Sequence, residues 1–227
     1  MKIIQGQGVS KGIEQGTIYF YHRAAAQVEM RTGADEQEER ARLERAKERT
    51  AQQLSDMAEK AREEAGDEAA VLFETHAMFL EDEDYTGAMD ELLAQGFNAE
   101  YAVDQAGQEF AAMLASMDDP YMQARAADIK DVTGRILNNL MGVVEGGIDS
   151  DVPVILAADD LAPSETIQLD KKKILAIATQ KGSGNSHTAI LARYHGHPRR
   201  VRPGGGLQRG FSWQAGLYCR GDRPAHP

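Results

Sequence analysis

Cysteine and long apolar runs are both scarce in this sequence of 227 residues. The single cysteine, Cys219, excludes an internal disulfide and a cysteine-rich metal site, which is usual in a reducing compartment. No run reaches the roughly 18 apolar residues that a membrane-spanning helix needs, and the opening MKIIQGQGVSKG lacks the apolar segment of a signal peptide. We therefore expect a cytoplasmic protein without a membrane partner, and its 42% apolar content suffices for folded cores.

Positive charge is also scarce, with 25 Lys and Arg against 36 Asp and Glu and a net charge of −11. Because nucleic-acid phosphates are bound by clustered Lys and Arg, this balance argues against a nucleic-acid partner and favours a basic one. Residues 194–227 contain six arginines and one acid, a net of +5, so −16 falls on residues 1–193. This tail also holds seven of the 22 glycines and four of the seven prolines, and we expect it to be poorly ordered.

The apolar pattern of residues 30–142 predicts a bundle of antiparallel helices. Apolar residues recur there every three or four positions, in segments that begin near residues 35, 67, 82, 98 and 119. Asn98 and Asp119 are expected N-caps, and Gly142 is expected to end the last helix. The second helix is expected to turn Met78 inward. The short links between these segments favour antiparallel neighbours.

Strand-like patterns lie on either side of the bundle. The TIYFY run near the N-terminus and residues 152–158 and 173–179 are rich in β-branched and aliphatic residues. Between the last two, ADDLAPSETIQL is typical of a loop followed by a short helix, with Ser164 as a candidate N-cap. We expect residues 1–29 and 143–193 to form one discontinuous α/β domain with the bundle inserted.

The segment GSGNSHTAILAR places His187 between a glycine-containing loop and the start of an apolar helix. A neutral imidazole has a free lone pair that can attack phosphorus, and the N–H groups at a helix N-terminus stabilise the attached phosphoryl oxygens. Gly182 and Gly184 leave room for the backbone, while Ser186 and Thr188 flank the histidine in this candidate phosphate loop. The alternative is an ordinary capped helix with an incidental histidine. The strand that leads into the loop favours phosphate handling.

Five stretches resemble one known family, in the family's order: GVSKGIEQG, LFETHAMFLEDED, RAADIKDVTGRIL, DLAPSET and SHTAILAR. Together they make residues 1–193 similar to the amino-terminal half of enzyme I, the phosphoenolpyruvate–protein phosphotransferase of the bacterial sugar phosphotransferase system. The resemblance implies an α/β phosphohistidine domain with an inserted all-α helical bundle.

The resemblance also implies roles for individual residues. His187 would accept phosphate from phosphoenolpyruvate and pass it to a histidine of the carrier protein HPr, while Thr166 would orient the imidazole ring. Met78 and Phe79 would either add apolar contact with HPr or belong to the core. The residues implied in HPr binding are Glu68, Glu74, His76, Asp82, Glu83, Asp84 and Arg125.

Two departures from the family limit what the resemblance implies. Ser183 replaces the second of two adjacent glycines, and its small side chain is expected to be tolerated. After Arg193 the sequence no longer resembles the family and reads like translation in another frame. We therefore expect the closing strands of the α/β domain to be missing, which would leave a sheet edge unpaired.

The family's second half is a barrel that binds phosphoenolpyruvate and magnesium and forms the dimer. Because this barrel has no counterpart in the sequence, we expect no metal or cofactor in this fragment, a monomer, and reversible phosphate exchange with HPr only.

Two other functions stay open on the sequence. One is the phosphohistidine swivel domain of a dikinase-like enzyme, which would not need an acidic helical bundle. The other is a noncatalytic helical interaction module, in which the His187 loop is merely structural.

Overall fold

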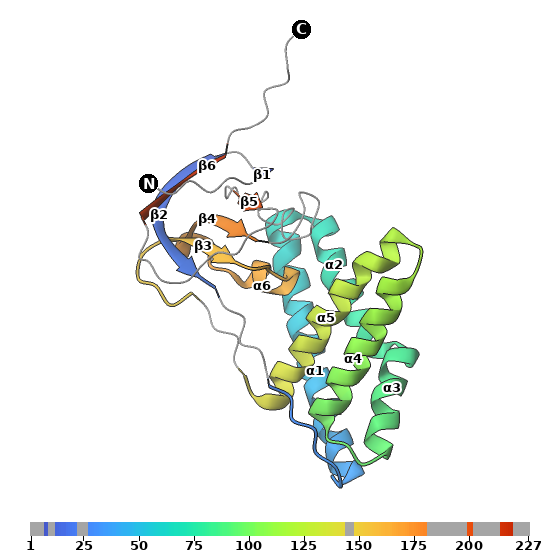
Figure 1. Ribbon diagram of the computed structural model, residues 1–227. Coiled ribbons are helices and arrows are strands. Elements are labelled where there is room, and N and C mark those ends of the chain that lie inside the picture. Colours follow the sequence, from blue (N-terminus) through green and yellow to red (C-terminus); the bar gives the residue numbers. More distant parts are fainter. Residues whose placement is uncertain are drawn as a thin grey trace. The chain divides into compact units, whose positions relative to one another are not determined.

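The computed structural model describes residues 7–8, 12–21, 27–143, 148–180, 199–201 and 214–219. The chain divides into an α/β unit, residues 1–23 and 146–227, and a helical unit, residues 24–145 (Figure 1). The expected fold class, an α/β domain with an inserted helical bundle, is confirmed. None of the described helices is long and apolar enough to cross a membrane.

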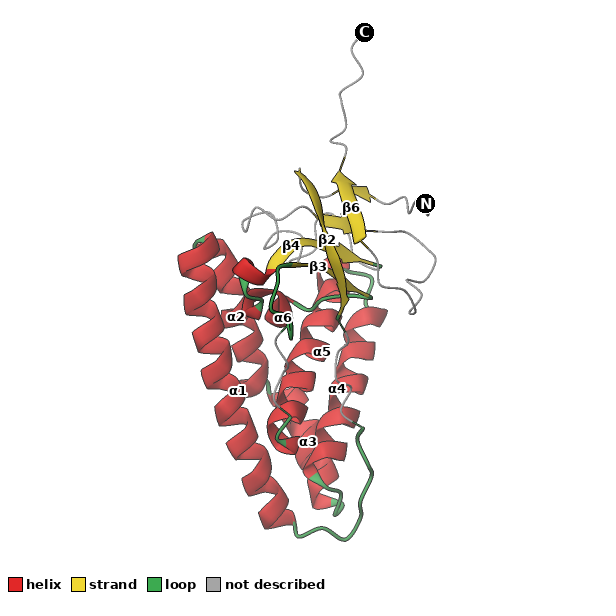
Figure 2. Cartoon of the chain, turned by 90° about the vertical axis from the view of Figure 1, so that its left-hand side faces the viewer, coloured by secondary structure: helices red, strands yellow, loops and turns green. Residues whose placement is uncertain are grey.

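The helical unit consists of antiparallel helices joined by short links (Figure 2). Its described elements are α1 Glu36–Ala65, α2 Asp67–Met78, the 3-10 turn η1 Phe79–Glu81, α3 Glu83–Ala94, α4 Ala99–Ser116 and α5 Pro120–Met141. Helix α1 packs against α2, and α4 packs against α5. The helices that the three- and four-residue spacing of apolar positions predicted are therefore confirmed, in the predicted order.

Local caps fix the starts of three of these helices and the end of α5. Asp35, Asp82 and Asp119 precede α1, α3 and α5, and each carboxylate accepts a backbone N–H of the first turn. Gly142 ends α5 in the left-handed region with φ 67°, where a side chain would be strained. The expected roles of Asp119 and Gly142 are confirmed.

The start of α4 is held by tertiary contacts instead. Asn98 occupies the expected N-cap position, but its side chain does not cap the helix. Its Oδ1 accepts the backbone N–H of Arg31 at 2.8 Å. The free N–H of Ala99 is bound by Glu39 Oε2, from α1, at 2.7 Å. The expectation that the Asn98 side chain is a cap was wrong because a residue distant in sequence satisfies the helix end.

The helical core is closely packed where α4 meets α5. A Cβ added at Gly107 in α4 would lie 2.4 Å from Thr133 Oγ1 in α5, so only glycine allows this approach. Thr133 Oγ1 also lies 2.7 Å from the hydroxyl oxygen of Tyr85, and burial raises the pKa of that hydroxyl. The largest fully buried side chains of this unit are Leu54, Phe73, Tyr85, Met89, Leu93, Ile129 and Ile136.

The α/β unit is built on a mixed sheet with the strand order β1-β5-β4-β3-β2-β6. Neighbours in the central run from β5 to β2 are parallel, while the outer pairs β1/β5 and β2/β6 are antiparallel. The strands are β1 Gln7–Gly8, β2 Gly12–Phe20, β3 Val154–Ala158, β4 Ile174–Thr179, β5 Arg199–Val201 and β6 Gln214–Cys219.

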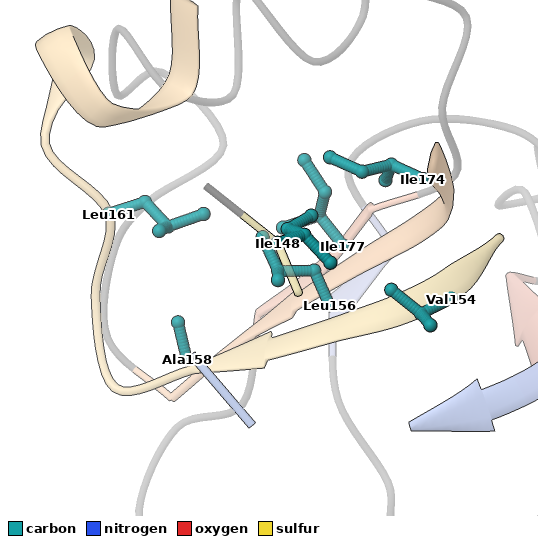
Figure 3. Packing of buried hydrophobic residues seen from close by; sticks show 7 residues of the cluster. All are labelled: Ile148, Val154, Leu156, Ala158, Leu161, Ile174 and Ile177. Atoms are coloured by element: carbon teal, nitrogen blue, oxygen red, sulfur yellow. The ribbon is translucent and has the colours of Figure 1, made fainter. Parts of the chain in front are cut away.

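Strand β3 lies at the centre of the core of this unit. All five of its residues are buried, as is typical of a strand with parallel neighbours on both sides. Helix α6, Pro163–Gln168, and the turn η2, Lys171–Lys173, connect β3 to β4. Figure 3 shows the cluster of apolar side chains that β3 and β4 form with Ile148 and Leu161; its members on the strands are Val154, Leu156, Ala158, Ile174 and Ile177.

Two strands lie in residues 194–227, where sequence patterning predicted little order. Strand β6 pairs with β2 along its whole length, and β5 pairs with both β4 and β1. The expectation of an unpaired edge was therefore wrong for β2 and β4. Strand pairing uses backbone N–H and C=O groups, which are present whatever the side chains, so a strand can pair where its side-chain pattern is weak.

Candidate functional site

The carboxyl ends of β3 and β4 form the centre of the candidate site. Ala158 and Thr179, the last residues of these parallel strands, are partners in the sheet. The N–H of Gln180 continues the pairing by donating to the Ala158 carbonyl at 3.0 Å. The segments that follow the two strands therefore leave the sheet side by side, where open α/β sheets bind ligands.

The segment after β4 carries the predicted phosphohistidine. His187 lies outside the described residues. The same holds for the phosphate-loop residues, which are Gly182, Gly184, Ser186 and Thr188. Their predicted roles stay predictions. The described part of the chain shows the strand that leads directly into this segment, as the sequence predicted.

The segment after β3 carries Thr166, which is buried in α6. Its Oγ1 donates to the Ala162 carbonyl at 2.9 Å. A hydroxyl has one hydrogen, so this contact leaves Oγ1 only lone pairs for another group. Thr166 is therefore suited to accept an N–H rather than to donate.

Glu165 fixes the start of α6. Its Oε2 accepts the backbone N–H of Ala162 at 2.6 Å, and its Oε1 accepts the Tyr21 hydroxyl at 3.2 Å. Ala162 is the N-cap position, so the expectation that Ser164 caps this helix was wrong. Proline is favoured at the first position of a helix, so α6 begins at Pro163, before Ser164.

A second candidate site is a stripe of exposed side chains on α2. The α2 stripe consists of Glu68, Val71, Glu74 and Met78, whose spacing of three or four residues places them on one helix face. Val71 is 53% exposed and Met78 is 70% exposed. The expectation that Met78 points inward was wrong, because the neighbouring Phe79 takes the buried position.

Arg125 of α5 joins this surface through an aromatic stack. Its guanidinium carbon lies 5.7 Å from the ring centroid of buried Phe79 and 4.8 Å from that of Tyr121. The guanidinium also donates to the Tyr121 hydroxyl. Tyr121 is 59% exposed and Arg125 is half-buried, so both side chains of this pair reach the surface.

The acidic residues expected at this surface have different local roles. Asp82 Oδ1 caps α3 by accepting the N–H groups of Asp84 at 3.1 Å and Tyr85 at 3.0 Å. Glu83 and Asp84 are exposed in the first turn of α3, next to the positive end of its dipole. Glu74 pairs with Arg62 of α1.

His76 was expected on the same surface, but its side chain is fully buried. Both ring nitrogens face carboxylates of α5: Nε2 lies 3.4 Å from Asp128 Oδ1, and Nδ1 lies 3.8 Å from Asp131 Oδ2. The interior position follows from helix spacing, because His76 shares a face with buried Leu72 and Phe73. In this structure its side chain does not contribute to the exposed surface.

Val71 and Tyr121 were not predicted from the sequence as surface residues. Val71 precedes Leu72 and Phe73, and three consecutive apolar residues of a helix cannot all face the core. This pattern indicates that one of the three lies outside the core, and the structure shows that it is Val71. Tyr121 follows Pro120 in the first turn of α5, and only the structure reveals its contact with Arg125.

Metal binding finds no support in the parts of the chain that the structure describes. No group of three or more His, Cys, Asp or Glu residues is arranged there to hold a metal ion. The carboxylates beside His76 face opposite nitrogens of its ring, so one ion could not contact all three groups.

Two family models match this chain. The model described as the N-terminal domain of PEP-utilising enzymes matches residues 5–125, more than half of the chain. The model described as the mobile domain of PEP-utilising enzymes matches residues 151–202. The second match extends past Arg193, beyond the point where the resemblance seemed to stop.

Curated relatives agree with these matches. The phosphoenolpyruvate-protein phosphotransferase of Priestia megaterium is 38% identical over 194 residues, which are 85% of this chain and 34% of the relative. The protein with the same name from Bacillus subtilis is 34% identical over 195 residues. The chain spans about a third of the length of these relatives.

Solved structures support the same family. The solution structure of enzyme I (nEIt) has a TM-score of 0.71 and 32% identity, and the match covers 88% of this chain and 82% of that chain. The N-terminal domain of Enzyme 1 - Nitrogen shares the fold, with a TM-score of 0.63 at 24% identity. The chain therefore belongs to the PEP-utilising enzymes, and it corresponds to the N-terminal part of enzyme I.

Proposed function

We propose that this chain carries a phosphoryl group on His187 and exchanges it with a histidine of HPr. The relatives named phosphoenolpyruvate-protein phosphotransferase support phosphotransfer as the general role. The observation that carries the proposal is the pairing of β3 and β4 up to Ala158 and Thr179. Because of this pairing, the segment that contains buried Thr166 and the segment that contains His187 begin at the same edge of the sheet.

The chemistry needs one nitrogen of each histidine. A ring nitrogen of His187 attacks the phosphorus of phosphorylated HPr, so a new N–P bond forms while the N–P bond of HPr breaks. The HPr imidazole leaves with the electron pair of the broken bond. Because the two bonds are of the same kind, transfer in either direction is feasible. Thr166 would accept the other ring N–H of His187 and leave the attacking nitrogen unprotonated.

HPr would bind to the α2 stripe together with Tyr121 and Arg125. The family resemblance implies that HPr presents a basic and apolar patch, and the acidic groups of α2 and α3 would attract such a patch and speed its approach. Exposed Val71, Met78 and Tyr121 supply the apolar contact that usually dominates binding energy. His76 is left out because its side chain is buried.

Phosphate transfer is tested by incubating the full chain with phosphorylated HPr and mapping the label by mass spectrometry. We expect label on His187, none in His187→Ala, and normal labelling in the control His195→Ala. Thr166→Val should slow labelling without moving it. Absence of label on the unchanged chain would overturn the proposal and favour a noncatalytic interaction module.

Docking is tested separately by calorimetric titration with unphosphorylated HPr. Met78→Ala is expected to raise the dissociation constant by roughly 5- to 30-fold, the range of a central apolar contact. Met113→Ala is the matched control, because Met113 is 43% exposed on α4, away from the stripe. Equal affinities for both variants would contradict the proposed surface. Absence of any HPr binding would favour a swivel domain of another PEP-utilising enzyme.

A further inference from the structure

Glu165 of α6 is a buried acidic residue that contacts two separate parts of the α/β unit. It is only 8% exposed. Its Oε2 accepts the backbone N–H of Ala162 at 2.6 Å, and its Oε1 accepts the hydroxyl of Tyr21 at 3.2 Å. Tyr21 directly follows β2, and its own N–H donates to the Ala157 carbonyl of β3 at 2.8 Å. The Glu165 side chain therefore ties the start of α6 to the end of β2.

Ala162 connects Glu165 to Thr166. The N–H of Ala162 is bound by Glu165, while its carbonyl accepts the Thr166 N–H at 3.0 Å and the Thr166 hydroxyl at 2.9 Å. The next residue, Pro163, has no N–H that could hold the chain at this point. A displacement of Ala162 would therefore move the acceptor of the Thr166 hydroxyl.

Capping alone does not require a buried acid at this helix start. Asp35 and Asp119 cap α1 and α5 from exposed positions. Taking a polar side chain out of water costs free energy unless its oxygens are paired, and Ala162 and Tyr21 supply that pairing here. With six residues, α6 is too short to be stable by itself, so tertiary contacts must set its position. The contact with Tyr21 is one of them.

We infer that Glu165 and Tyr21 are positioning residues, which hold the Ala162 carbonyl against the Thr166 hydroxyl and so fix the direction of that hydroxyl. The consequence for His187 rests on the proposed function. While its hydrogen points to Ala162, the hydroxyl can only accept the ring N–H, and the other ring nitrogen stays free to attack. A hydroxyl released from Ala162 can donate to the ring instead. The attacking nitrogen would then carry the proton, and transfer would slow.

The first test reads the Glu165 contact without HPr, as the amide proton signal of Ala162 in the full chain. An N–H that donates to a carboxylate makes a short, strong hydrogen bond, which moves its proton signal downfield. We expect a downfield signal in the unchanged chain and an upfield shift of it in Glu165→Ala. The same signal position in both proteins would overturn the inference.

The second test measures the labelling rate at saturating phosphorylated HPr, well below the unfolding temperature. Glu165→Ala should slow labelling roughly tenfold and Tyr21→Phe about twofold, because small displacements of positioned groups cost rate. Glu165→Gln should be near normal, since its amide oxygen can accept from Ala162 and its amide N–H can donate to Tyr21. Tyr19→Phe is the matched control, in the same strand and against the same apolar cluster, and should leave the rate unchanged.

A double variant distinguishes positioning from a merely structural role. If Glu165 acts through Thr166, Glu165→Ala combined with Thr166→Val should be no slower than Thr166→Val alone. Losses that multiply in the double variant would overturn the positioning role.

The remaining outcomes separate this inference from the proposed function. Absence of label on the unchanged chain defeats the phosphotransfer proposal, and the Ala162 signal still decides whether Glu165 holds Ala162. Normal labelling of the unchanged chain and of Glu165→Ala overturns only the positioning role. If Glu165→Ala unfolds, Tyr21→Phe against Tyr19→Phe decides, and equal rates for these two would overturn the inference.

Discussion

The helical unit and the α/β unit differ in how far along the chain their stabilising contacts reach. In the helical unit the starts of α1, α3 and α5 are each capped by the residue just before them, Asp35, Asp82 or Asp119. In the α/β unit, strand β2 pairs with β3, and its Tyr19 faces Leu156. Because its contacts are local, the helical unit could be predicted from the spacing of apolar residues. The sheet instead pairs segments that lie far apart in the sequence.

The strongest way to test this comparison is to weaken each core by itself. Leu156→Ala in β3 and Ile129→Ala in α5 remove buried side chains, and each should cost about 2–5 kcal/mol of unfolding free energy. Hydrogen exchange measured by mass spectrometry should show faster exchange mainly in the unit that carries the change. Val152→Ala, at a 57% exposed position, is the control. Equal loosening of both units by either variant would show that they fold as one.

Gly107 tests the place where the helical unit depends on close tertiary approach. Gly107→Ala should destabilise the chain by about 1–3 kcal/mol, because the new Cβ would overlap Thr133. Gly134→Ala is the matched control in α5, where nothing lies within 4 Å of the added Cβ. It should stabilise the helix by roughly 0.5–1 kcal/mol, since alanine has the higher helix propensity. Urea unfolding measures both, and the same sign for both changes would contradict the packing described.

Glu100 tests the long-range contacts at the start of α4. Burial opposes its ionisation, but hydrogen bonds from Arg42 and Asn98 outweigh burial and lower the pKa of Glu100 to about 2 from 4.5. A lowered pKa in the folded state adds stability above about pH 4.5, and this stability is lost as the pH falls toward 2. Glu100→Gln should cost about 1–2 kcal/mol at pH 7 and flatten the acid dependence.

The control for Glu100 is Glu109→Gln, an exposed change on the same helix. Thermal unfolding between pH 2 and 7 should give parallel curves for Glu109→Gln and the unchanged chain. A Glu100→Gln curve parallel to these two would mean that the carboxylate has no special stabilisation.

Changes at Asp82 have the smallest expected effect on stability, and they separate its role as a cap from the effect of its charge. Asp82→Ala removes the cap of α3 and should cost about 1 kcal/mol, whereas Asp82→Asn keeps a capping oxygen and should cost little. Circular dichroism during thermal unfolding measures the difference. In HPr titrations both variants should bind more weakly to a similar degree if only the charge matters there. Equal stability of the two variants would contradict the capping role.

Helix positions were predictable because their signals lie within a few residues. The cap at Asp119 and the stop at Gly142 follow from local chemistry alone. The exceptions involve partners far away in sequence: Glu39 binds the start of α4 and makes the Asn98 cap unnecessary. Met78 was misplaced because a helical spacing of apolar residues does not reveal which of two adjacent apolar residues is buried.

The candidate site was predictable in its residue types but not in its contacts. The sequence indicated Thr166 and the acidic residues, whereas the Thr166 contact with Ala162 and the burial of His76 required the structure. The acidic stretch around His76 indicated a surface position, but its spacing from Leu72 and Phe73 places it on the buried face of α2. Its interior position depends on which face of α2 meets α5.

The parallel pairing of β2 with β3 has a consequence for how the protein forms. Parallel strands need a crossover connection, and here the entire helical unit is that connection. Closing an unstructured loop costs conformational entropy, and this cost grows slowly with loop length. The contact of Asn139 with Thr50, at 2.9 Å, ties the last helix of this connection to its first. The folded insertion thus replaces a long unstructured loop, and it allows β2 and β3, which lie far apart in the sequence, to pair as neighbouring strands.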